Sequence, residues 1–214
     1  QKPKLFYAVP NFQNPSGVTW NAARREAVAG VIAGKPLYFV EDDPYGELRF
    51  SGEPQVSMKV LAPENTVLLG SFSKIFAPSL RLGWIAAPRE ILDRITVAKQ
   101  AADLHTNYFS QRILMDFLQY NDLEAHITRI RTAYGAQRNA MVKGLEEHMP
   151  AGTKWTNPEG GMFLWVTLPE GMKALSFFDR AIARKVAFVP GNPFYPSEPD
   201  VRTMRLNFSC SDEA

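Results

Sequence analysis

Short apolar runs alternate with a helical pattern in the first part of the chain. The apolar runs are KLFYAVP at 4–10, PLYFVED at 36–42, TVLLGSF at 66–72 and LRLGWIAAP at 80–88. Between the first two, TWNAARREAVAGVIAG places alanine, valine and isoleucine at helical spacing after a candidate helix cap, Thr19. Strand, helix and strand in this order predict an α/β fold with a mostly parallel sheet that helices cover. Ligands are then expected at the carboxyl ends of the strands.

The second part of the chain has a different pattern. From about Ser110 to Met149 the pattern is helical, and its apolar residues from Ile127 to Met149 are spaced to share one helix face. Further on, 155–171 predicts a strand between turns, 176–186 a helix, and 187–191 and 203–209 short strands. We therefore expect two domains, a larger one over residues 1–125 and a smaller α+β one over 126–214, joined through a linking helix at about 126–149.

Composition and charge narrow the class of protein. The chain has 214 residues, 45% of them hydrophobic, and no apolar run reaches the roughly 18 to 20 residues of a membrane span. A formal charge of +2 is too small to indicate a nucleic-acid surface. One cysteine excludes an internal disulfide, and three scattered histidines indicate no metal site. We expect a cytoplasmic protein with small-molecule partners.

Polar residues follow each of the first three predicted strands. They lie in the segments PNFQNPSG, EDDPYGEL and GSFSK, and a shared sheet would bring these to one crevice: Asn14, Asp42, Tyr45, Ser71, Ser73 and Lys74. Pyridoxal phosphate needs an amine for its aldehyde, an acid for its ring nitrogen, a donor for its phenolate oxygen and several donors for its phosphate. The chain offers all four, so we expect pyridoxal 5'-phosphate as the cofactor.

Six segments also carry a family resemblance. They are FQNPSG, EDDPYGEL, SFSK with Arg81, KQAADLHTN, PEGGMFLWV and MRLNFS. In this order they resemble the class I/II aminotransferases of fold type I, especially the subgroup with 2-aminoadipate and kynurenine aminotransferases. The resemblance covers essentially the whole chain, which makes it far more specific than any single motif. It implies the fold type I architecture, with residues 1–125 as part of the large cofactor-binding domain, and a homodimer.

The resemblance also implies a role for each matching residue. Lys74 would form the Schiff base with the cofactor and then carry the proton between substrate and cofactor. Asp42 would pair with the ring nitrogen, while Asn14 and Tyr45 would bond the phenolate oxygen. Arg205, with Asn14, would bind the substrate α-carboxylate through the planar pair of donors that a guanidinium presents. The phosphate would be held by Ser71, Ser73 and Arg81.

Simpler interpretations exist for each of these residues alone. Asp42 or Asp43, which precede a proline, could form a turn. Arg81 and Arg205 could make surface ion pairs. Only the joint order of the segments favours the functional interpretation.

The resemblance further implies that family members extend beyond this chain. Their amino-terminal part carries a phosphate-binding loop and an aromatic residue that stacks on the cofactor, and a final helix follows the RLNFS segment. We therefore expect an internal fragment, inactive alone, of an aminotransferase that exchanges an amino group between an L-amino acid and a 2-oxo acid. The alternatives are the effector domain of a MocR-type transcriptional regulator and another fold type I enzyme, such as a decarboxylase or lyase.

Overall fold

The chain forms two compact units in a computed structural model that describes residues 2–210. The first unit comprises residues 1–10, 20–48 and 53–130, and the second comprises 11–19, 49–52 and 131–214. Each unit has its own four-stranded sheet. No helix within residues 2–210 is both long and apolar enough to cross a membrane.

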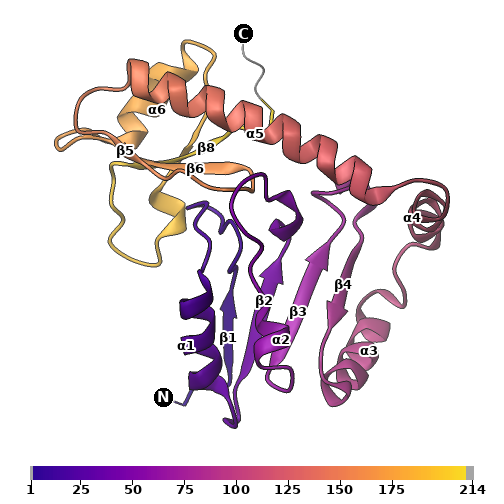
Figure 1. Cartoon of the computed structure of the whole chain (residues 1–214). Helices are drawn as coiled ribbons and strands as arrows, with labels where there is room; N and C mark the ends of the chain where they lie inside the picture. The colour runs from indigo at the N-terminus through magenta and orange to yellow at the C-terminus, as the bar shows by residue number, and fades with distance from the viewer. Residues whose placement is uncertain (1, 211–214) are drawn as a thin grey trace. The chain divides into compact units, whose positions relative to one another are not determined.

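The sheet of the first unit is mostly parallel. It contains β1 (Leu5–Ala8), β2 (Tyr38–Asp43), β3 (Thr66–Ser71) and β4 (Gly83–Ala86), in that spatial order (Figure 1). The first three strands run parallel to one another, and β4 pairs antiparallel with β3. All four strands predicted from the apolar runs are therefore confirmed, and so is the α/β class.

The helices of the first unit are α1 (Ala22–Ile32), α2 (Met58–Leu61), α3 (Arg89–Asp103) and α4 (Tyr108–Tyr120). Two short 3₁₀ turns, η1 (Gly46–Leu48) and η2 (Pro78–Leu80), follow β2 and β3 along the chain. Helix α1 is capped by Asn21, whose Oδ1 accepts from Arg24 N at 2.9 Å. The prediction that Thr19 caps this helix is wrong. The Thr19 Oγ1 instead accepts from Phe12 N at 3.2 Å.

A buried ion pair ties α1 to β2. Arg25 on α1 and Glu41 on β2 are both fully buried, with Arg25 Nη1 3.6 Å from Glu41 Oε1. The Arg25 guanidinium also donates to three backbone carbonyl oxygens, those of Pro10, Trp20 and Val56. Because side chains alternate along a strand, Asp42 projects from the face of the sheet opposite to Glu41.

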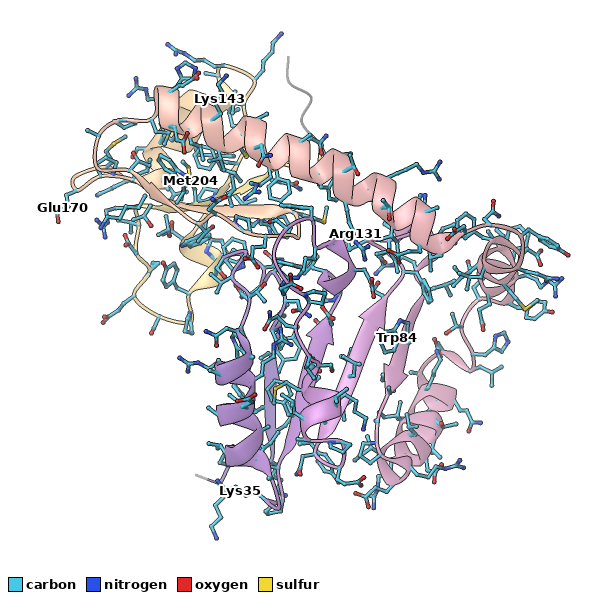
Figure 2. The ribbon with its side chains drawn as sticks, in the orientation of Figure 1. Lys35, Trp84, Arg131, Lys143, Glu170 and Met204 are labelled. Carbon is cyan, nitrogen blue, oxygen red and sulfur yellow. The ribbon has the colours of Figure 1, made fainter. Side chains whose placement is uncertain are left out.

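Strands β3 and β4 approach closely at a glycine. Trp84 on β4, labelled in Figure 2, lies so near Gly70 on β3 that an added Cβ would be 2.1 Å from the indole Cε2. Only glycine leaves room for the indole in its observed position. Gly70 directly precedes Ser71, so this contact lies at the end of β3 that leads toward Lys74.

The helical stretch expected from Ser110 to Met149 contains two helices, and the second lies close to the bounds expected for the linking helix. Helix α4 ends at Tyr120, and α5 (Leu123–His148) begins after a break. Asp122 accepts a hydrogen bond from Ala125 N at 3.0 Å and so provides a start for α5. The first turns of α5 belong to the first unit and the rest belongs to the second.

The second unit is an antiparallel α+β arrangement. Its sheet has the order β5 (Lys154–Trp155), β6 (Phe163–Thr167), β8 (Thr203–Asn207) and β7 (Val189–Pro190). Helix α6 (Ala174–Ile182) and the 3₁₀ turn η3 (Asn192–Phe194) complete it with most of α5. The predicted strands and helix of this region are confirmed, apart from shifts of a few residues at their ends.

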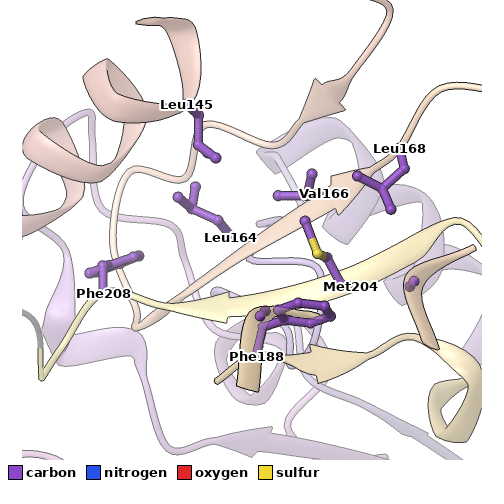
Figure 3. Close-up of a cluster of buried hydrophobic side chains, with 9 residues drawn as sticks. Leu145, Leu164, Val166, Leu168, Phe188, Met204 and Phe208 are labelled. Carbon is purple, nitrogen blue, oxygen red and sulfur yellow. The ribbon is translucent and has the colours of Figure 1, made fainter. Parts of the chain in front are cut away.

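The core of the second unit joins α5, α6 and the sheet. Leu145 of α5 packs with residues of β6 and β8, among them Leu164, Val166 and Met204 (Figure 3). Phe208, which follows β8, is fully buried in the same cluster. This core fixes β8, the strand that carries Arg205.

Candidate active site

The carboxyl ends of β2 and β3 lie side by side at one end of the first sheet. In the parallel register Asp42 pairs with Leu69 and Asp43 with Gly70, and the turn with Lys74 follows directly after β3. The sheet therefore brings the Asp42 segment and the Lys74 segment together, as the sequence predicts. Tyr45, Ser71, Ser73 and Arg81 belong to the same unit.

The two neighbouring aspartates at the end of β2 make different hydrogen bonds. Asp43 forms the turn, since its Oδ1 accepts from Gly46 N at 2.8 Å. Asp42 Oδ2 instead accepts from the Tyr7 hydroxyl of the adjacent strand at 2.5 Å. Asp43 therefore stabilises the turn, whereas the Asp42 carboxylate faces the neighbouring strand.

Tyr7 was not singled out from the sequence, yet it contacts a predicted site residue. Partial desolvation of the hydroxyl is the first cause that raises the Tyr7 pKa to about 12, followed by its hydrogen bond to Asp42 and by electrostatic interaction with Asp42 and Tyr45. The Tyr7 hydroxyl therefore stays protonated, and remains a donor, throughout the physiological pH range. Tyr45, which lies in the chain between the end of β2 and the start of η1, is buried.

The turn after β3 gathers two hydroxyls and an amine. Ser73 N donates to Ser71 Oγ at 3.1 Å, and Phe76 N donates to Phe72 O at 2.9 Å, which closes the turn around Lys74. Lys74 is half-buried. Because Ser71 Oγ accepts in this turn, its own hydroxyl hydrogen can still be donated to a ligand.

Arg81 has a left-handed backbone. It caps η2 with φ 54° and ψ 41°, and its Nη1 donates to Pro78 O at 3.2 Å. For a residue with a side chain, this conformation costs about 1–2 kcal/mol.

The second unit places Arg205 and Asn14 in direct contact. Arg205 Nη1 donates to Asn14 Oδ1 at 2.6 Å. The peptide bond between Asn14 and Pro15 is cis. Arg205 and Asn14 are the two residues that the resemblance assigns to the substrate carboxylate, and one unit contains both.

Aromatic rings surround the Arg205 guanidinium. Its central carbon lies 4.3 Å from the ring centre of Phe163 and 5.2 Å from that of Phe194. Trp165 is directly opposite Arg205 in the β6–β8 pairing, and its ring packs edge-on against Phe194. Rings on a guanidinium stabilise it and restrict its plane, so this cation is held in one orientation. The sequence alone does not indicate that Phe194 packs on Arg205, because this contact joins two separate segments of the chain.

Metal chemistry has no candidate site in the described chain. Among residues 2–210, no group of three or more histidine, cysteine, aspartate or glutamate side chains could hold an ion. The polar groups near the ends of β2 and β3 include an amine, a carboxylate and hydroxyls, and the Arg81 guanidinium follows at the end of η2.

Comparison with known proteins identifies the family. A family model described as aminotransferase class I and II matches residues 1–214. Aromatic-amino-acid aminotransferase 1 of Thermococcus litoralis is 47% identical over 214 residues, which is 100% of this chain and 51% of that protein. The 2-aminoadipate transaminase of Thermus thermophilus is 36% identical over 99% of this chain and 54% of its own length. The chain thus spans about half the length of the curated relatives it matches.

Solved structures agree with the sequence comparison. The crystal structure of Pyrococcus horikoshii kynurenine aminotransferase, in complex with PMP, superposes with a TM-score of 0.93 at 47% identity, over 98% of this chain and 52% of that one. Among the sequence relatives there is also a protein of Bacillus subtilis named as an uncharacterized HTH-type transcriptional regulator, YisV, which is 32% identical over 96% of this chain and 42% of its own length. The fold is that of the fold type I aminotransferases, and the chain belongs to the aminotransferase class I and II family.

Proposed function

We propose that the polypeptide containing this chain is a pyridoxal-phosphate-dependent aminotransferase, which exchanges an amino group between an L-amino acid and a 2-oxo acid. The observation that carries the proposal is the parallel register of β2 and β3, which brings the Asp42 segment and the Lys74 turn to one end of the sheet. Family membership over the whole chain supports the same reaction.

The donor set fits this cofactor, with every donor named here in the first unit except Asn14, which belongs to the second. When bound, pyridoxal phosphate supplies an aldehyde that bonds reversibly to an amine and a ring that accepts electrons from the substrate α-carbon. Lys74 would provide the amine, and Asp42 would keep the ring nitrogen protonated. Tyr45 and Asn14 would donate to the phenolate oxygen. The phosphate would be bound by Ser71, Ser73 and Arg81.

Two residues would handle the substrate. The bond between Lys74 and the cofactor would be exchanged for one to the substrate amine. The freed Lys74 amine would then hold and move the proton between the substrate α-carbon and the cofactor. Arg205 would bind the α-carboxylate with two parallel N–H donors, with its guanidinium plane restricted by Phe163 and Phe194. The hydrogen bond to Asn14 supports the same orientation.

The names of the relatives support a proposal for the substrate class. We propose an aromatic or a long-chain acidic amino acid as amino donor, since the relatives act on aromatic amino acids and 2-aminoadipate by name. A homodimer, a cytoplasmic location and the absence of nucleic-acid or membrane partners remain part of the proposal. So does the division into a large cofactor domain over 1–125 and a small domain over 126–214.

A second candidate is a regulator that uses the same fold to sense the cofactor. The similarity to a helix-turn-helix-type regulator supports this alternative. A regulator of this kind needs cofactor binding but no turnover. A multiple-turnover assay therefore separates the two functions.

The test is amino transfer by the polypeptide that contains this chain. It is incubated with pyridoxal phosphate, 2-oxoglutarate and either L-phenylalanine, L-kynurenine or L-2-aminoadipate, and the glutamate formed is measured. We expect many turnovers per protein molecule, and loss of turnover in Lys74→Ala. Cofactor binding without any turnover on these donors would favour the regulator.

A further inference from the structure

Tyr7 and Asp42 form a polar contact across two neighbouring strands. Tyr7 pairs with Val40 in the parallel β1–β2 register, and Asp42 is two residues further along β2. Residues two apart on a strand share a face, so Tyr7 and Asp42 project from the same side of the sheet. The Tyr7 hydroxyl donates to Asp42 Oδ2 at 2.5 Å.

Packing alone does not account for this geometry. Tyr7 is 53% exposed, so its ring is not held in place by a core. A short hydrogen bond to an ionised carboxylate is stronger than one between neutral groups, and it fixes both partners. Since rotation of a carboxylate about its terminal torsion is otherwise nearly free, the bond restricts the plane in which the second Asp42 oxygen lies.

We propose that Tyr7 is a positioning residue for Asp42: it binds one carboxylate oxygen and thereby orients the other toward the cofactor's ring nitrogen. This proposal rests on the proposed function, because it gives Asp42 the role of ring-nitrogen partner. Tyr7 acts through Asp42. Besides Asp42, the buried Tyr45 also interacts electrostatically with Tyr7.

The chain offers a matched control for the test. Tyr38, on β2, also donates to a carboxylate, that of Glu90 at the start of α3. It begins β2, whereas Asp42 lies near the end of the same strand. Tyr38→Phe therefore removes the same kind of bond without touching Asp42.

The experiment reads Asp42 directly in residues 1–214. The ¹³Cγ resonance of Asp42, assigned by its loss in Asp42→Asn, is recorded at neutral pH in the wild type, Tyr7→Phe and Tyr38→Phe. We expect Tyr7→Phe to shift this resonance and Tyr38→Phe to leave it in place. An Asp42 resonance that is the same in all three would overturn the proposal.

A second readout links the contact to the cofactor. In the cofactor-loaded polypeptide, Tyr7→Phe should move the ring ¹⁵N resonance of labelled pyridoxal phosphate, and Tyr38→Phe should not. An unmoved ring resonance in Tyr7→Phe, with Lys74 still labelled by the cofactor, would end the Tyr7 proposal and leave the proposed function intact. Failure of Lys74 to bond the cofactor would end both.

Discussion

Arg205 and Asn14 are 191 positions apart in the sequence, yet Arg205 Nη1 donates to Asn14 Oδ1 at 2.6 Å. The NPSG turn and the MRLNFS strand thus meet within one unit. Phe163 and Phe194 pack on the same guanidinium. The arrangement leaves a cation of fixed plane with an amide beside it, which is a suitable site for a carboxylate.

Arg205→Lys should impair use of the amino donor far more than cofactor binding. A lysine keeps the charge but loses the paired donors, and a hydrogen bond to a charged group contributes about 1.5–3 kcal/mol, so kcat/KM should fall by roughly 10- to 100-fold. Arg202→Lys is the control, since Arg202 is bound to Asp200 at 2.8 Å in the turn before β8. Equal kcat/KM values for the two variants would refute the assignment of Arg205.

Arg25→Met should destabilise the chain strongly. It would leave the buried Glu41 carboxylate without its cation and would remove the donor to three carbonyl oxygens. Breaking a buried pair by removing one partner costs about 3–5 kcal/mol. Arg24→Met, at the exposed neighbouring position, should change the unfolding free energy by less than about 0.5 kcal/mol. Urea unfolding of both variants checks this, and similar midpoints would contradict it.

Two glycines near the end of α1 should respond in opposite directions. An added Cβ meets nothing within 4 Å at either Gly30 or Gly34, but Gly34 has φ +66° while Gly30 lies within the helix. Gly30→Ala should stabilise the chain by about 0.5–1 kcal/mol, because alanine loses less backbone freedom on folding. Gly34→Ala should destabilise it by about 1–2 kcal/mol, the cost of a left-handed conformation. Thermal unfolding would disprove the argument if both variants moved in the same direction.

Tyr7→Phe should change how stability depends on pH in alkaline solution. The Tyr7 pKa is raised from 10.0 to about 12 in the folded chain. A group with a raised pKa contributes stability that is complete below its unfolded pKa and is lost as pH rises through the folded one. The wild type should therefore lose stability relative to Tyr7→Phe between pH 10 and about 12, and not below pH 10. Urea midpoints at a series of pH values measure the difference, and a constant difference would contradict the assignment.

The sequence predicted the strands well because each apolar run is bounded by turn residues. The resemblance assigned Asp42 to the site, but the local sequence left open whether Asp42 or Asp43 forms the turn before proline. The side chain of Asp43 closes that turn by accepting from Gly46 N, while Asp42 turns to the hydroxyl of Tyr7 on the neighbouring strand. A contact between two strands leaves no pattern in the local sequence, so the hydrogen bond of Tyr7 to Asp42 could not be predicted.

Helix ends and buried charges were predicted less well. Thr19 and Asn21 are both good caps by type, and only the backbone path decides that Asn21 is used. The burial of Arg25 beside the exposed Arg24 depends on Glu41 and on carbonyls from distant segments. Helical spacing alone did not distinguish them.

The most direct test of the account is where pyridoxal phosphate bonds to the protein. The polypeptide that contains this chain is mixed with the cofactor, reduced with borohydride and digested with trypsin, which cannot cut at a modified lysine. The account predicts one stoichiometric pyridoxyl label, on Lys74 in a peptide of residues 60–81, and no such label in Lys74→Arg. A stoichiometric label on a different lysine, with Lys74 unmodified and cut normally by trypsin, would contradict it.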